Sequence, residues 1–112
     1  MKKYAIIIPV HKAAYIKEFN GRDDLYLLIF DKVGSRVRAI DTVPDFGEDY
    51  KIIASELNNG AENEIATFIS MLPESEDIHG PAIILYVPEG GDAGCSLEVA
   101  ENIRDYINNL RL

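Results

Sequence analysis

The chain reads AIILYVPEGGDAGCS from Ala82 to Ser96. Its first six residues form an apolar run that predicts a buried strand, and the segment after Ser96 has helical periodicity. Gly90, Gly91 and Gly94 let the intervening backbone approach a ligand, and the N–H groups of a helix start attract negative charge. Cys95 is the only cysteine of the chain. A strand, a glycine-rich loop and a helix start in this order predict a binding site.

The helix that follows is the clearest element of the sequence. Ser96 is a natural N-cap, and Glu98 and Glu101 stand where the positive end of the helix dipole favours acids. An apolar stripe at helical spacing runs along the predicted helix from Leu97 to Leu110. Its members are Val99, Ile103, Tyr106, Ile107 and Leu110.

The N-terminal part predicts strands. Tyr4 to Val10 is apolar without alternation, as in a central strand covered on both faces. Leu25 to Phe30 predicts a second strand, and Asp31 to Ser35 a hairpin turn in which Gly34 takes a positive φ. Arg36 to Ile40 alternates polar with apolar residues, which predicts a third, half-exposed strand. We therefore expect the chain to open with an antiparallel meander.

The middle of the chain predicts helices. Tyr50, Ile53, Ala54 and Leu57 fall at helical spacing, and Asn58-Asn59-Gly60 is a good helix stop. Residues 64–72 are ambiguous, because their apolar positions fit a helix while their composition suits a strand. The pattern favours a helix, and the strand remains an alternative. The strand from Ala82 to Val87 is expected to run parallel to the first one.

Composition limits the class of protein. The chain has 112 residues, 47% of them hydrophobic and 27% charged, which indicates one globular domain over residues 1–112. The net charge of -8 comes from residues 57–112, which hold ten acids and two arginines. This balance disfavours nucleic acids and anionic membranes as partners. Apolar runs far shorter than a membrane span and a single cysteine lead us to expect a cytoplasmic protein.

The expected order of elements is three strands, a helix, a strand or helix, a strand and a helix. This order resembles ribonuclease H-like α/β folds and, within them, the dinitrogenase iron–molybdenum cofactor biosynthesis family. The resemblance rests on Ile6–Val10 as the opening strand and on Phe19–Arg22 before Tyr26–Asp31 as the Phe-Gly-Arg element. It rests also on the closing strand, glycine-rich turn and helix. It implies a three-layer mixed sheet and a cofactor of iron–sulfur or iron–molybdenum type.

Two groups of residues are candidates for a site. Arg22, fixed by a glycine, suits a bidentate clamp on an anion, although a salt bridge to Asp23, Asp24 or another acid is an equal alternative. The predicted ligand-binding residues are Gly21, Arg22, Gly90, Gly91, Gly94 and Ser96, and the predicted metal ligands are His11 and Cys95.

Opposing effects act on the thiol of Cys95. Helix-start N–H groups would lower its pKa, whereas the neighbouring carboxylates would raise it. A reactive thiol and a small, inert residue are both open at this position. No phosphatase, Walker or dinucleotide signature surrounds the loop, and the first strand lacks the carboxylate that a ribonuclease H-type nuclease needs. We therefore predict no catalytic residues.

Two functions follow as predictions. The first is a non-enzymatic carrier of a metal cofactor or anionic ligand, whose site is a rim formed by His11, Phe19 to Arg22, and Gly90 to Ser96. These segments meet only if the first and last strands are close and parallel. The alternative is a protein-interaction module, a homodimer through the edge strand Arg36 to Ile40, acting through its acidic C-terminal half.

Overall fold

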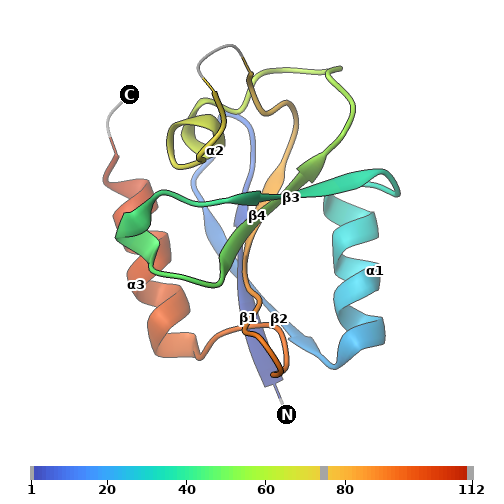
Figure 1. Cartoon of the computed structure of the whole chain (residues 1–112), viewed down its shortest axis with the longest axis vertical. Helices are drawn as coiled ribbons and strands as arrows, with labels where there is room; N and C mark the ends of the chain where they lie inside the picture. Colours follow the sequence, from blue (N-terminus) through green and yellow to red (C-terminus); the bar gives the residue numbers. More distant parts are fainter. Residues whose placement is uncertain (1, 74–75, 111–112) are drawn as a thin grey trace.

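The computed structural model describes residues 2–73 and 76–110, which form one five-stranded sheet and three α-helices (Figure 1). The strands are β1 (Lys2–Ile8), β2 (Tyr15–Asn20), β3 (Val37–Asp41), β4 (Tyr50–Ser55) and β5 (Ala82–Tyr86). The helices are α1 (Arg22–Lys32), α2 (Glu64–Phe68) and α3 (Leu97–Asn108), with a 3-10 turn η1 (Pro44–Phe46) between β3 and β4. None of the described helices is long and apolar enough to cross a membrane.

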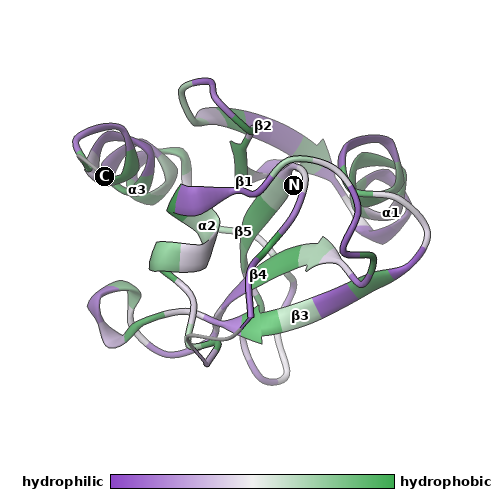
Figure 2. Ribbon diagram, turned by 90° about the horizontal axis from the view of Figure 1, so that it is seen from above, coloured by the Kyte–Doolittle hydropathy of each residue, from purple (hydrophilic) through white to green (hydrophobic). Residues whose placement is uncertain are grey.

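The sheet lies between two helical layers. Alternate residues of a strand point to opposite faces, and the buried isoleucines of the central strands divide accordingly. Ile6 and Ile84 pack with Ile103 of α3, whereas Ile7 and Ile83 pack with Leu28 of α1. Figure 2 shows α1 on one side of the sheet and α2 and α3 on the other. The expectation of an α/β fold is therefore confirmed.

The segment predicted as the second strand is a helix. Leu25 to Phe30 lies within α1, so the prediction of a three-stranded meander is wrong. The helix begins after Gly21, whose φ of 88° turns the chain away from β2, and the Asp24 carboxylate accepts a hydrogen bond from the Asn20 N–H at 2.7 Å. An acceptor in the first turn that reaches back to the preceding backbone stabilises a helix start.

The segment predicted as a helix after Pro44 is a strand. In β4, Ile52 is buried toward α3 and Ile53 toward α1, so neighbouring residues enter opposite cores. Two adjacent β-branched residues suit a sheet that is covered on both faces. The predicted hairpin turn at 31–35 instead connects α1 to β3. Gly34 has the expected positive φ, 123°, but there it ends α1, with its N–H donating to the Ile29 carbonyl at 3.1 Å.

The direction of β5 also differs from the prediction. The spatial order is β2-β1-β5-β4-β3, and every neighbouring pair is antiparallel, so the sheet is not mixed. Ala82 pairs with Ile8, which places the start of β5 where β1 ends. The expected sequence of elements is corrected to strand, strand, helix, strand, strand, helix, strand, helix, and the ribonuclease H-like layout is not confirmed.

Other predicted elements are confirmed. β1, β3 and β5 occupy the predicted segments, and residues 64–68 are helical as α2. α3 begins after Ser96, whose hydroxyl oxygen accepts a hydrogen bond from the Val99 N–H at 3.3 Å. The buried side of α3 consists of Ala100, Ile103 and Ile107. The strand–loop–helix unit with which the sequence ends is therefore present.

Candidate functional site

The predicted rim is divided between the two ends of the sheet. Gly21 follows Asn20, which pairs with Lys2 at the start of β1, and Cys95 forms a bridge with Tyr4 of the same strand. His11 follows the other end of β1. Ile8 lies four strand positions beyond Tyr4, which is about 13 Å of extended chain. Because β5 is antiparallel to β1, the structure brings Gly21 and the glycine loop to one end and leaves His11 at the other.

Arg22 lies at the first position of α1 and is exposed. Among the described residues it forms no ion pair, and Asp24 is engaged with the Asn20 backbone instead. The alternative of a salt bridge from Arg22 to Asp23, Asp24 or another acid is therefore not found among the described residues. The guanidinium is therefore accessible to solvent.

Gly94 allows the loop to pack closely against Lys3 and Phe19. Its φ is 105°, and a Cβ atom there would lie 2.5 Å from Lys3 Cβ and 2.6 Å from Phe19 Cζ. Its N–H donates to the Tyr86 carbonyl at 2.7 Å, which closes the loop that leaves β5. Gly94 therefore allows the chain to return against β1, and no space remains beside it for a ligand.

The other loop residues have structural roles as well. Gly91 donates to the Pro88 carbonyl at 3.4 Å, so Gly90 and Gly91 form an exposed turn. The hydroxyl oxygen of Ser96 is used as the N-cap of α3. These contacts fit an exposed surface turn better than the predicted ligand loop.

Cys95 is a buried, free thiol. Its backbone pairs with Tyr4 in both directions, at 3.0 and 3.1 Å, and Sγ lies 3.5 Å from the Tyr4 carbonyl oxygen. Burial raises the pKa of the thiol, and the smaller opposing effects of the backbone and Lys3 do not reverse this. The protonated form therefore dominates near neutral pH, as expected for a small core residue.

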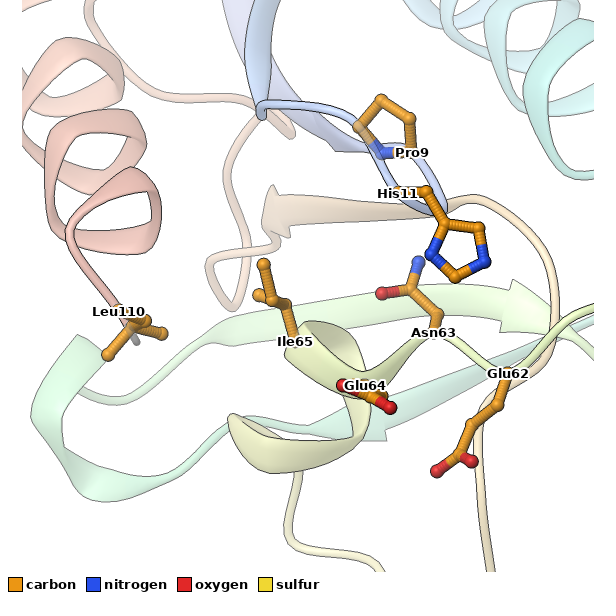
Figure 3. A pocket seen from close by; sticks show the side chains of 7 residues that line it. All are labelled: Pro9, His11, Glu62, Asn63, Glu64, Ile65 and Leu110. Atoms are coloured by element: carbon orange, nitrogen blue, oxygen red, sulfur yellow. The ribbon is translucent and has the colours of Figure 1, made fainter. Parts of the chain in front are cut away.

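His11 lines a cavity of about 240 Å³ at the opposite end of the sheet (Figure 3). Its φ is 63°, a turn conformation that histidine adopts more readily than most residues. The buried polar group nearby is Asn63, whose amide nitrogen donates to the carbonyls of Ile8 (2.9 Å) and Gly80 (3.0 Å). Its oxygen accepts from Ala66 N–H at 3.1 Å. Asn63 therefore joins β1, the approach to β5 and α2, and both hydrogens of its amide nitrogen are used within the fold.

A metal cofactor does not fit the predicted ligands. His11 and Cys95 lie at different ends of β1, and the thiol is buried and protonated. Within residues 2–73 and 76–110, no three His, Cys, Asp or Glu side chains are grouped so that they could hold a metal ion. These residues therefore do not form the iron–sulfur or iron–molybdenum site that the resemblance implies.

The most unusual surface is one that the sequence did not predict. Tyr26, Leu27 and Phe30 point outward from α1 and are 58%, 68% and 65% exposed, while Leu25 and Leu28 of the same helix are buried. We call these three side chains the outer face of α1. The apolar run itself was visible in the sequence. Because every residue from Leu25 to Phe30 is apolar, the sequence pattern does not distinguish this face from the buried one.

The free edge of β3 is a less favourable interaction surface than the outer face of α1. It is an edge strand, as predicted, but it has only five residues. Its end is covered on the outer side, where Met71 N–H donates to the Asp41 carbonyl at 2.9 Å and Thr42 bridges to Ser70. Short, partly covered and charged edges resist pairing with another strand.

Comparison of the chain with protein-family models, with curated proteins and with solved structures found no match in any of the three. The function is therefore inferred from the residues of this chain and from their geometry.

Proposed function

We propose that this protein is a protein-interaction module that associates with a second copy of itself through the outer face of α1. The observation that carries the proposal is the exposure of Tyr26, Leu27 and Phe30 on a helix whose other side is already buried. A helix that is apolar on all sides is typically buried on all sides.

The spacing of the outer face suits a twofold pair. Leu27 and Phe30 are three residues apart, so they lie on one side of the helix. In an antiparallel pair of α1 helices, Leu27 of one copy packs against Phe30 of the other, and the reverse contact follows by symmetry. The antiparallel arrangement also places the helix dipoles in opposition, which is favourable.

The size of the face predicts a weak complex. At the exposed fractions above, the three side chains present on the order of 400 Å² per copy. A pair would bury roughly 800 Å², which is below the range of about 1,200–2,000 Å² for stable interfaces. We therefore expect a reversible dimer with a dissociation constant in the micromolar range or weaker.

Sedimentation velocity over a concentration series tests this proposal. The wild-type protein should shift from monomer toward dimer as its concentration rises. Leu27→Glu and Phe30→Glu should each weaken association at least about tenfold, because each places a carboxylate in the contact.

Phe68→Glu is the matched control. Phe68 is 56% exposed and also lies on a helix, but α2 packs on the opposite face of the sheet. This variant should associate like the wild type. A protein that stays monomeric up to about millimolar concentration, the weak limit of measurable affinity, overturns the proposal, and so does equal weakening by Phe30→Glu and Phe68→Glu.

The carrier function stays a prediction from the sequence. It needs His11, Arg22 and the Gly90–Ser96 loop in one place, and only the last two share an end of the sheet. The outer face of α1 gives the interaction module the stronger support. The edge strand β3 and the acidic half of the chain are the other surfaces predicted for such a module.

A further inference from the structure

A second cavity of about 240 Å³ lies between η1, the start of β4 and α3, on the sheet face opposite α1. η1 and α3 are side by side in Figure 1. The residues that line the cavity are three aromatic ones, two polar ones and two apolar ones: Phe46, Tyr50, Tyr106, Asp45, Asn102, Val99 and Ile103. We call these seven residues the aromatic pocket.

Two of the three rings are perpendicular to each other. The centroids of Phe46 and Tyr106 are 5.4 Å apart and their planes meet at 88°, so the two rings form a corner. The ring of Tyr50, the third aromatic residue of the pocket, is tilted against the ring of Tyr86, and their centroids are 4.9 Å apart. This contact holds the Tyr50 ring in place. The Tyr106 hydroxyl donates to Asp45 Oδ2 at 3.4 Å, so the carboxylate is held at the rim.

The charged residues around the aromatic pocket are mostly acidic. Residues 42–49, which include η1, carry Asp45, Glu48 and Asp49 and no basic residue. α3 carries Glu98, Glu101 and Asp105, and its one arginine, Arg104, is paired with Asp105 at 3.0 Å. The potential near the cavity is therefore negative, and it attracts cations.

We propose that the aromatic pocket binds a methylated ammonium group. The faces of aromatic rings carry negative charge density and attract cations, and rings set at angles surround such a group on several sides. The methyl groups supply apolar contact for the rings, while Asp45 and its acidic surroundings supply the opposite charge. An anion would be repelled, and a neutral apolar group would gain nothing from the carboxylate.

The pattern is visible in the sequence once the pocket is known. Each of its aromatic residues directly follows an aspartate, in the pairs Asp45-Phe46, Asp49-Tyr50 and Asp105-Tyr106. The three pairs come from separate elements. Only the folded chain brings them together, which is why the sequence did not indicate this site.

Calorimetric titration of the full chain with choline and with 3,3-dimethyl-1-butanol tests the proposal. The second compound is the neutral carbon analogue of choline, with the same shape and no charge. Choline should bind at least about tenfold more tightly. A parallel titration with trimethyllysine amide distinguishes the sources of the group: tighter binding than choline indicates a modified protein side chain, and weaker binding a free metabolite.

Two substitutions separate the contributions of charge and ring. Asp45→Asn keeps the shape and removes the charge, and it should weaken choline binding severalfold and reduce its dependence on salt. Tyr106→Leu keeps an apolar side chain and removes the ring, and it should weaken binding about three- to thirtyfold. Tyr15→Leu, which changes an exposed tyrosine on β2, is the matched control and should leave choline binding unchanged.

Equal binding of choline and its neutral analogue overturns the proposal, as does failure of both cations to bind at about 10 mM, beyond the weak end of ordinary affinities. If Tyr106→Leu fails to fold, judged by amide dispersion in its NMR spectrum, Asp45→Asn decides alone. The aromatic pocket is remote from the outer face of α1. A failure to observe cation binding and a failure to observe the proposed dimer are therefore independent results.

Discussion

Gly94 is the residue on which the return of the glycine loop to β1 depends. Gly94→Ala should lower the free energy of unfolding by on the order of 3 kcal/mol, because its Cβ would overlap Lys3 and Phe19 and its φ of 105° is strained for alanine. Urea denaturation measures this loss. The control is Gly90→Ala: Gly90 also has a positive φ, 74°, but has nothing within 4 Å of the added atom. A loss of about 1 kcal/mol is expected there. Equal losses would refute the packing role of Gly94.

The thiol of Cys95 makes stability depend on pH. Because burial raises its pKa in the folded chain, the unfolded chain loses the thiol proton first as the pH rises. Unfolding then releases a proton, so the contribution of Cys95 is fully present below the ordinary cysteine pKa of about 8.5 and is lost above it. The free energy of unfolding of the wild type should therefore fall more between about pH 8 and pH 10 than that of Cys95→Ala. Urea denaturation across this range measures both. Parallel pH profiles would contradict the assignment.

At the scale of elements, the amide of Asn63 links three of them. Asn63→Asp keeps the oxygen that caps α2 but removes the two hydrogen bonds donated to Ile8 and Gly80. It should lower the free energy of unfolding by about 2–4 kcal/mol, since it also buries a charge against carbonyl groups. Thermal or urea denaturation measures the change. Asn59→Asp, in an exposed loop, should cost less than about 0.5 kcal/mol. A similar effect of both substitutions would show that Asn63 does not join the elements.

The errors in the predicted elements have a common physical cause. α1 is apolar on its buried and its exposed side, so Leu25 to Phe30 shows no helical stripe, and an unbroken apolar run resembles a buried strand. In β4, Ile52 and Ile53 are both buried because the sheet is covered on both faces, so no alternation marks the strand. α3 was predictable because Ile103 and Ile107 face the core while Glu98 and Glu101 face solvent.

The site depended on information that local patterns do not contain. Whether His11 meets Cys95 is decided by the direction of β5, which long-range pairing with Ile8 fixes. The aromatic pocket likewise combines residues from three elements. The capping role of Ser96, in contrast, needs only four consecutive residues, and the sequence predicted it correctly.

At the scale of the whole molecule, the net charge of -8 opposes self-association. Raising the salt concentration from about 20 to about 300 mM shortens the range of this repulsion. The proposed dimer should therefore become tighter, whereas choline binding to the aromatic pocket should become weaker. Sedimentation velocity and calorimetry at the two salt concentrations measure these opposite trends. A dimer that weakens with salt would contradict an apolar interface on α1.

The most direct test of the proposed interface is the NMR spectrum of uniformly labelled protein over a concentration series. Amide signals of Tyr26, Leu27 and Phe30 should shift progressively as the protein is concentrated, while those of Val37 and Ala39 on the β3 edge stay fixed. Self-association that shifts β3 and leaves α1 unchanged would contradict the account, and so would spectra that do not change with concentration.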